Sequence, residues 1–450
     1  MSIQVHFVMF MWVPFVVYMF SMKDPREASL ICFISAWLFL PNAEYQLSGL
    51  PEYNKVSATC YGIVLSACLF DRNNILKWRP QWYDLPMIIF CISPLFSSLS
   101  NGLGLYDGLS CSLGQTVTWG LPYFIGRYYF SDRRTIRKLM EFIIIGGLLY
   151  VPLCLIEVRV SPQLHKWVYG YHVADFGQSI RYGGYRPTVF MEHGLMVGMW
   201  MATALLSAVV YAYQKKSILW FKTRKKSIVA VFLVTLVLIK STGAIILFVY
   251  AFMAVYSVQQ FKTKVVVILL LLMPLFYLGG RTFSDWDPNI LVQWAEKSIN
   301  KERAQSLAFR IENEEMIVNK AKLRPIFGWA DWGRWRIYND DGEDITISDS
   351  LWAIIFGRNG YVGLFSLYIV LMSPLVIMIF KQSANKWFNN NNYPYSLMAL
   401  LCALYAMDCL MNAMINPFFA LCAGAVMNYN MYLNPVKKEK RQSSLKLKTT

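Results

Sequence analysis

The stretch SIVAVFLVTLVLIKSTGAIILFVYAFMAVYS, residues 227–257, is apolar over nearly its whole length and is interrupted at KSTG, residues 240–243. Basic residues lie beyond both of its ends, at 222–226 and 262–264. A transmembrane helix needs about 20 apolar residues, fewer if it is short or enclosed by protein. Because basic loops lie in the cytoplasm, two short helices that turn at 241–243 would keep both basic ends on one side. We expect this hairpin; a single span with a polar kink is the alternative.

Similar apolar blocks recur along the whole chain and decide its class. Of the 450 residues, 56% are hydrophobic and only 16% are charged, whereas soluble domains carry about 25% charged residues. A β-barrel would show short alternating segments instead. The sequence therefore predicts an all-α polytopic membrane protein with about 12–13 transmembrane helices. Besides 227–257, the blocks are 5–20, 29–40, 56–70, 85–99, 113–130, 136–156, 188–213, 265–278, 351–380, 395–411 and 417–433.

Basic residues beside these blocks predict the topology. The positive-inside rule places the clusters at 133–138, 215–226 and 262–264 in the cytoplasm. Transmembrane helices 1 to about 10 then occupy residues 1–280, a large and partly helical external loop occupies 281–349, C-terminal transmembrane helices occupy 350–433, and a basic cytoplasmic tail occupies 434–450. On this count the N-terminus is external, although a short first hairpin would reverse it.

The net charge of +16 raises the question of a nucleic-acid partner. A nucleic-acid-binding protein needs a basic face on a folded domain, but here the basic residues lie beside apolar blocks. The nine cysteines lie within or at the edge of apolar segments and lack the spacing of metal ligands. We therefore expect membrane lipids and not nucleic acid as partners, and neither a metal nor another cofactor.

The first unusual polar segment on the predicted external side is RYGGYRPTVFMEHG, residues 181–194. Arg181 and Arg186 lie beside two glycines, which let a backbone approach a ligand closely. Arginine binds phosphate through two parallel hydrogen bonds, so both arginines are candidates for an anion site. Glu192 and His193 enter an apolar block, where ionisable residues are functional candidates. The alternative is that Arg186 and Glu192 form a structural ion pair at the membrane edge.

The second polar segment is the predicted external loop, which shows a helical pattern over 289–322. Arg303 and Arg310 are seven residues apart and therefore share a helix face. Arg310 would instead pair with Glu314 if the two residues, which are four apart, formed the usual helical ion pair.

Two further candidates follow in the same loop. Trp329 belongs to the motif RPIFGW, residues 324–329, and is either an interfacial residue or a surface that stacks on sugar rings. Asp349 comes directly before the next apolar block. It is either a general base or the N-cap of the following helix.

Taken in order, these motifs resemble the O-antigen ligase and polysaccharide polymerase superfamily of bacterial inner membranes. The shared features are the Arg-x-x-Gly segment before a span, a helix pair broken at Ser-Thr-Gly, an external loop with RPIFGW, and a span that contains GYVGL, residues 360–364. The resemblance covers mainly residues 180–380. It implies a GT-C-like, metal-independent glycosyltransferase that uses a glycan on undecaprenyl diphosphate at the periplasmic face, so that the loop 281–349 would be periplasmic.

The resemblance also implies a donor site. Arg181 and Arg310 match the family arginines that are thought to hold the donor diphosphate, with Arg186 as an additional candidate. The family often has Ser-Arg at the helix break, where Lys240 would supply the positive charge in this sequence.

The acceptor base is where this sequence departs from the family. The family often has a histidine near the end of the external loop, and Asp349 stands there instead. Asp349 is therefore the first candidate for the group that activates the acceptor hydroxyl, and His193 is the second. Arg303, Trp329 and Glu192 are the remaining site candidates.

The missing histidine favours a polysaccharide polymerase, for O-antigen or exopolysaccharide, over an O-antigen ligase that transfers glycan to lipid A-core. The polymerase acceptor would be another lipid-linked glycan, and exopolysaccharide assembly proteins would be possible partners. A lipid-linked glycan transporter or flippase is the alternative from another class, but such proteins often carry internal repeats, which we do not find. A non-catalytic assembly subunit is a third alternative.

Overall fold

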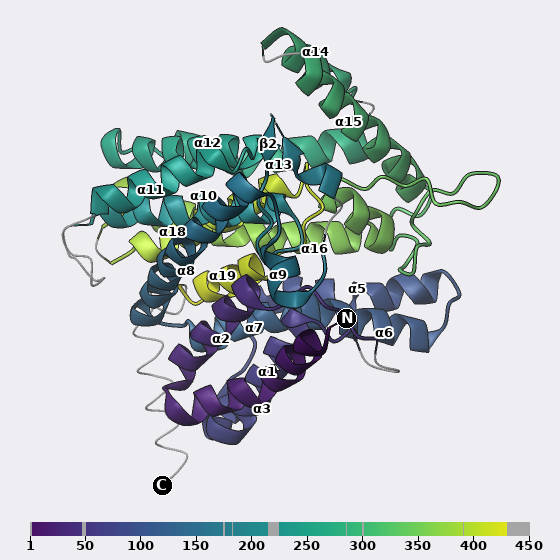
Figure 1. Ribbon diagram of the computed structural model, residues 1–450. Helices are drawn as coiled ribbons and strands as arrows, with labels where there is room; N and C mark the ends of the chain where they lie inside the picture. The colour runs from purple at the N-terminus through teal and green to yellow at the C-terminus, as the bar shows by residue number, and fades with distance from the viewer. Residues whose placement is uncertain are drawn as a thin grey trace.

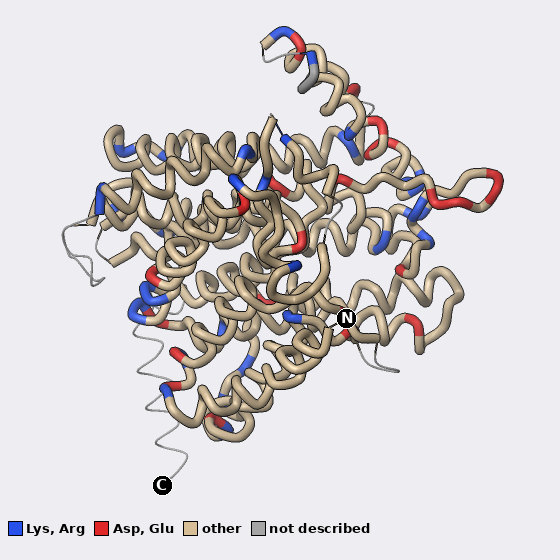
Figure 2. The backbone as a smooth tube through the Cα atoms, in the orientation of Figure 1, with Lys and Arg blue, Asp and Glu red and all other residues tan. Residues whose placement is uncertain are grey.

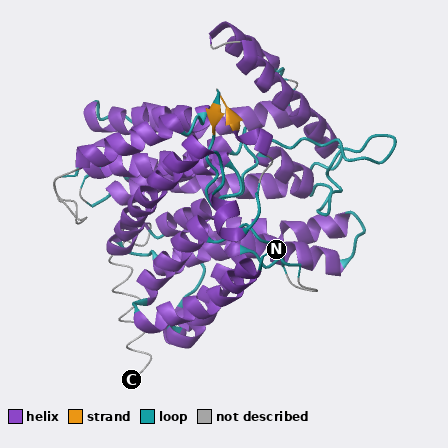
Figure 3. Cartoon of the chain, in the orientation of Figure 1, coloured by secondary structure: helices purple, strands orange, loops and turns teal. Residues whose placement is uncertain are grey.

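The computed structural model describes residues 2–46, 51–173, 176–181, 183–214, 225–284, 286–298, 301–389 and 391–429, without the side chains of 302 and 303. The regular structure of the described chain is helical, apart from one small β-hairpin, and long irregular connections join some of the helices (Figures 1 and 3). The predicted basic tail at 434–450 and most of the basic cluster at 215–226 lie outside the described residues.

The helices are α1 (Ile3–Met22), α2 (Pro25–Phe39), α3 (Lys55–Phe70), α4 (Arg72–Lys77), α5 (Leu85–Ser100), α6 (Leu105–Gln115), α7 (Leu121–Tyr129), α8 (Arg133–Val160), α9 (Leu164–Tyr169), α10 (Gly194–Ala212), α11 (Lys225–Leu238), α12 (Thr242–Gln260), α13 (Val265–Phe283), α14 (Asn289–Ser298), α15 (Lys301–Lys322), α16 (Leu351–Lys381), α17 (Ala384–Trp387), α18 (Tyr393–Asp408) and α19 (Pro417–Met427). Short helical turns are η1 (Trp82–Asp84), η2 (Thr116–Gly120) and η3 (Phe176–Ser179), and the strands are β1 (Ile180–Arg181) and β2 (Gly184–Tyr185).

Seven of the described helices are long and apolar enough to cross a membrane. They are α1, α5 together with η1, α8, α10, α12, α13 and α16, while α3 and α19 are apolar but shorter. Every apolar block of the sequence coincides with one or two helices. The protein is therefore an all-α, multi-pass membrane protein, as the composition predicts.

The ends of the helices gather at two faces of the bundle. The loop face consists of the described residues of the connections 40–54, 101–104, 161–193, 239–241, 284–350 and 409–416. The basic face consists of the connections 23–24, 71–81, 130–132, 261–264 and the described part of 382–392. Charged residues concentrate toward the ends of the helices, and few lie in between (Figure 2).

Hydrogen bonds and ion pairs tie the connections together within each face. On the loop face, the Asn101 side chain donates to the Gly328 carbonyl over 2.9 Å. On the basic face, Arg26 lies 2.7 Å from Asp132, and Lys138 lies 2.7 Å from Glu27. Connections far apart in sequence therefore form two continuous surfaces, which agrees with helices that alternate in direction.

The long apolar stretch at 227–257 forms the predicted hairpin. α11 ends at Leu238 and α12 begins at Thr242. Between them, Lys240 has a φ of 57°, a left-handed conformation that a helix cannot continue through. Lys225 and Lys264, which flank the helix pair, both donate to carbonyl groups at the basic face over 2.6 Å. The prediction of two helices joined by a turn is confirmed, but the turn lies at residues 239–241, two residues before the predicted position at 241–243.

α10 is the most enclosed of the candidate spans, because 89% of the residues in its apolar 18-residue stretch are buried. Both helices of the hairpin pack on it. The contact is close at Gly198, where a Cβ atom would lie 2.6 Å from the Ser241 hydroxyl oxygen. The helix break therefore lies against the first turns of α10, next to the loop that precedes this helix.

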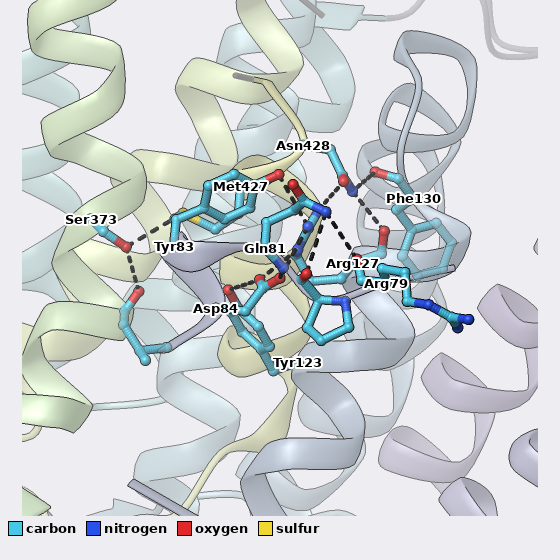
Figure 4. Close-up of polar contacts among 12 residues, drawn as sticks. Arg79, Gln81, Tyr83, Asp84, Tyr123, Arg127, Phe130, Ser373, Met427 and Asn428 are labelled. Carbon is cyan, nitrogen blue, oxygen red and sulfur yellow. Dashed lines mark hydrogen bonds and ion pairs between the residues drawn. The ribbon is translucent and has the colours of Figure 1, made fainter. Parts of the chain in front are cut away.

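A fully buried ion pair joins three helices near the basic face (Figure 4). Arg127 of α7 donates from Nε to Asp84 Oδ1 over 2.7 Å, and both side chains are completely enclosed. Tyr123 donates to the same carboxylate over 2.8 Å, and Arg127 also donates to the side chain of Asn428, directly after α19. Because an unpaired buried charge costs about 3–5 kcal/mol, this network fixes α5, α7 and α19 relative to one another.

Two glycines bring the backbones of α7 and α19 into contact. A Cβ atom on Gly126 would lie 2.1 Å from the Leu421 carbonyl oxygen, and one on Gly424 would lie 2.0 Å from the Tyr123 carbonyl oxygen. Small residues at such crossings are typical of membrane helices, whose association depends on close packing. The pair of glycines sets the spacing that the neighbouring ion pair requires.

The RPIFGW motif docks on a break in α16. At Gly360 the backbone leaves the helical conformation, with φ 59° and ψ −159°. The freed groups pair with the motif: Trp329 N–H donates to the Gly357 carbonyl over 2.8 Å, and Tyr361 N–H donates to the Pro325 carbonyl over 2.7 Å. A Cβ on Gly360 would lie 2.4 Å from a backbone oxygen of the motif. The two sequence motifs are thus one structural unit, which fixes the connection 284–350 to the bundle.

Candidate functional site

A buried carboxylate holds the loop that precedes α10. Glu157, in the last turn of α8, accepts hydrogen bonds from the N–H groups of Thr188 and Val189 over 2.9 and 2.7 Å. It also accepts from the Leu164 N–H over 2.9 Å. Val189 has a φ of 52°, a conformation that needs such support in a β-branched residue. Glu157 thereby fixes the path of the chain into α10.

The β-hairpin just upstream places two arginines. β1 and β2 are antiparallel, with Arg181 opposite Gly184. The Arg186 N–H continues the pairing and donates to the Ser179 carbonyl over 2.7 Å. Arg181 therefore lies on the hairpin, and Arg186 lies between the hairpin and the loop that Glu157 holds.

Arg186 lines a small, open pocket beside the start of α10. Its side chain is 8% exposed, and its buried Nε has no hydrogen-bond partner within the described ranges. Leaving such a donor unsatisfied costs about 1–3 kcal/mol, so the position favours a ligand that brings an acceptor. Polar residues around the pocket are His165, His172, Gln178, Ser179, Thr188 and His193.

The helix break adds a cation to the same region. A Cβ atom on Gly184 would lie 2.3 Å from Lys240 Nζ, so the ammonium group rests directly on the β-hairpin. A side chain at position 184 would displace it. Lys240 of the α11–α12 turn and Arg181 of the hairpin are thereby brought together from distant parts of the sequence.

Arg310 reaches the loop face from α15. Its Nη1 donates to the Met411 carbonyl over 2.6 Å and to Asn412 Oδ1 over 3.3 Å. Its Nε lies 3.5 Å from Asp349 Oδ2. The acceptors come from the connection after α18 and from the segment before α16, so three separate parts of the chain meet at this guanidinium group.

The three arginines form one electrostatic cluster. Burial and, to a lesser extent, the positive charges of Arg181 and Arg310 together lower the pKa of Arg186 to about 10. Arg186 remains protonated at pH 7 with this pKa. Like charges repel each other, and an anion that binds among the three arginines relieves this repulsion.

His193 caps α10 and is neutral at pH 7. Its Nδ1 accepts a hydrogen bond from the Leu195 N–H over 3.2 Å, and its Nε2 lies 3.2 Å from Gln178 Oε1. Burial lowers the pKa of His193 to about 4, helped by the nearby charges of Arg186, Arg181 and Arg310. Because both ring nitrogens have partners and the pKa is low, the geometry suits a helix cap better than a general base.

We expect His193→Asn to retain the protein's activity in cells, because asparagine also caps helices well. In the wild type the imidazole is neutral when folded and becomes protonated in the unfolded chain below about pH 6.5. Thermal unfolding of the purified protein should therefore show that the wild type loses stability relative to His193→Asn as the pH falls from 6.5 toward 4. A folded His193→Asn protein without activity would instead place His193 in the chemistry.

Three structural alternatives from the sequence are not found in the residues that the structure describes. Glu314 pairs with Arg281 of α13, 3.1 Å away, and not with Arg310. Asp349 does not cap a helix, because α16 begins at Leu351 with Ser350 in the N-cap position. No ion pair joins Arg186 to Glu192 among the described residues.

The remaining site candidates lie outside the arginine cluster or cannot be placed. Glu192 is exposed and contributes, after burial and Glu52, to raising the pKa of Glu44 in the connection 40–54. Trp329 donates to the Lys320 carbonyl over 2.8 Å, and Arg324 lies over its ring at 4.6 Å, so its ring is covered by protein. The side chain of Arg303 is outside the described part of the chain.

Sequence reasoning missed the residues that hold the cluster in place. Glu157 accepts hydrogen bonds from the loop that precedes α10. Gln178 contacts His193, and Asn412 accepts a hydrogen bond from Arg310. Only Glu157 carries a signal, because it is a charged residue near the end of an apolar block. In the described ranges, no group of three His, Cys, Asp or Glu side chains could hold a metal ion.

Comparison with known proteins assigns no family. No protein-family model matches the chain, and no curated protein matches it.

Proposed function

We propose that this protein is a membrane glycosyltransferase that polymerises a polysaccharide, O-antigen or exopolysaccharide, from repeat units linked to undecaprenyl diphosphate. Its location would be the bacterial inner membrane, with the loop face toward the periplasm. The observation that carries the proposal is the convergence of Arg181, Arg186 and Arg310 near Lys240, at the start of α10, the most enclosed of the candidate spans.

The chemistry of the cluster suits a lipid-linked diphosphate. Arginine binds phosphate oxygens through its planar fork, and the start of α10 adds partial positive charge. Breaking the bond between sugar and diphosphate develops negative charge on the leaving group. Fixed cations in a site with little water stabilise that charge in the transition state.

Asp349 is the proposed general base. Its carboxylate lies 3.5 Å from the Arg310 guanidinium group, which places it beside the proposed leaving group. It has no capping role, and its side chain is 40% exposed, so an acceptor hydroxyl can approach it. An acceptor sugar on a second lipid carrier would lose its hydroxyl proton to this group.

Deleting the gene in the bacterium that carries it tests the proposal. Loss of a polymerase should leave single repeat units on undecaprenyl diphosphate in the periplasmic leaflet. Loss of a ligase would leave long polymer on the lipid, and loss of a flippase would leave repeat units in the cytoplasmic leaflet. Lipid extraction followed by mass spectrometry distinguishes chain length, and accessibility of the glycan to a lectin in spheroplasts distinguishes the leaflet.

The proposed orientation predicts which residues label from outside. Asp340 is exposed on the loop face, so Asp340→Cys should react with a membrane-impermeant maleimide in intact spheroplasts. Asn385→Cys, exposed on the basic face, should react only after permeabilisation. Both variants are made in a Cys68→Ser background, because Cys68 is the exposed cysteine in the described chain. The reverse pattern would turn the protein over in the membrane and contradict the proposal.

A further inference from the structure

Arg310 is shared between two unequal sets of acceptors. Its Nη1 is held by the Met411 carbonyl over 2.6 Å and by Asn412 over 3.3 Å. Its Nε faces Asp349 over 3.5 Å, which is longer than the roughly 2.7–2.9 Å of a charge-assisted hydrogen bond. The first set fixes the guanidinium group on the bundle, and the second is a loose, partly exposed ion pair.

Asp349 is free to leave this ion pair. It lies in the irregular segment between the external loop and α16, and the cap of α16 is the neighbouring Ser350. A partly exposed ion pair contributes little to stability. The carboxylate can therefore turn away without moving Arg310, whose position depends on Met411 and Asn412.

We propose that Asp349 is the resting counter-ion of Arg310 and that the donor diphosphate takes its place when it binds. The inference rests on the proposed function and adds to it that binding of the donor releases the base. A diphosphate offers more charge and more acceptor oxygens than one carboxylate, and it also meets Arg181 and Arg186. The exchange therefore favours the diphosphate at the guanidinium group and releases the carboxylate beside the reacting sugar.

The exchange makes the base available only when the donor is bound. The acceptor hydroxyl oxygen then forms a bond to the anomeric carbon of the donor sugar, while the bond from that carbon to the diphosphate oxygen breaks. The electron pair leaves with undecaprenyl diphosphate, and the hydroxyl proton passes to the Asp349 carboxylate. Without donor, the carboxylate stays paired with Arg310 and is not turned toward an acceptor hydroxyl.

Binding of undecaprenyl diphosphate to the full chain in nanodiscs tests the exchange. Asp349→Asn removes the competing charge, so its Kd should fall about two- to fivefold, as expected for one partly exposed ion pair. Polymer formation in cells should nevertheless be lost, because asparagine cannot accept the proton. The matched control is Asp344→Asn, which removes a carboxylate of the same loop that pairs with Arg336 and should change neither property.

A second variant guards against misfolding. Asp349→Glu keeps the charge, so it should bind undecaprenyl diphosphate as the wild type does and retain part of the polymer formation. Unchanged or weaker binding by a folded Asp349→Asn protein would overturn the exchange and leave the proposed function standing. Tighter binding by Asp349→Glu would also overturn it. Failure of the wild type to bind undecaprenyl diphosphate would overturn the proposed function and the exchange together.

Discussion

Replacing Arg310 by alanine is expected to abolish polymer formation while the protein stays in the membrane at its normal level. The guanidinium group is fixed by the Met411 carbonyl and by Asn412, so it is already placed for the leaving diphosphate. Removing one such preorganised donor typically lowers the rate about 10²–10³-fold. Arg310→Lys should restore little, because lysine lacks the planar fork.

The measurement is polymer formation in a deletion strain that expresses each variant, with membrane level followed by immunoblotting. Arg336→Ala is the matched control, because Arg336 also lies in the segment between α13 and α16 and pairs only with Asp344 among the described ion pairs. It removes the same charge from the same face without touching the cluster. Full activity in Arg310→Ala, or equal loss in Arg336→Ala, would contradict a role for Arg310 on the diphosphate.

The membrane fold could be predicted because its determinants are local. A long apolar block forms a helix whatever its neighbours are, since backbone groups in lipid must be satisfied within the segment. The break at 240–243 was also visible, because Lys240 inside an apolar block is costly unless it reaches a polar site. The structure places that lysine on Gly184, a partner that sequence spacing could not identify.

The buried Arg127–Asp84 pair could not be predicted. Its two members lie 43 residues apart, and each comes at the end of an apolar block, where charged residues normally meet water. Only the packing of α7 on α19 through Gly126 and Gly424 encloses them. Pairing of this kind depends on which helices are neighbours, and apolar blocks carry little information about that.

The candidate site was predicted as residues but not as contacts. The positive charges of Arg181 and Arg310 act on Arg186, although the three arginines come from two separate polar segments. The helical spacing of Arg310 and Glu314 predicted an ion pair between them, and this was wrong because Arg281 reaches Glu314 from α13. Arg281, which is buried together with the Glu314 carboxylate, pairs with it in place of Arg310, whose side chain is partly exposed.

Replacing Glu314 by alanine is expected to have the largest effect on stability. Its carboxylate is buried and accepts hydrogen bonds from Tyr277, Arg281, Ser350 and Trp352, at 2.7, 3.1, 3.0 and 3.0 Å. These donors belong to α13, to α16 and to the N-cap of α16. Removing the carboxylate leaves a nearly enclosed Arg281 charge without its partner, which costs about 3–5 kcal/mol. Thermal unfolding in detergent should show a large drop in Tm.

Replacing Glu314 by glutamine removes the charge of the side chain but keeps its shape. Glu314→Gln fits the same space, but its amide nitrogen is a donor and would face the donors of Ser350 or Trp352, so we expect it to be nearly as unstable as alanine. Glu315→Ala is the matched control, because Glu315 is exposed on the same helix and should leave the Tm almost unchanged. Equal Tm values for Glu314→Ala and Glu315→Ala would show that the carboxylate does not hold the helices together. Because Glu314 lies one helical turn after Arg310, any Glu314→Ala protein that still folds should also lose polymer formation, since α15 would no longer present Arg310 to the cluster.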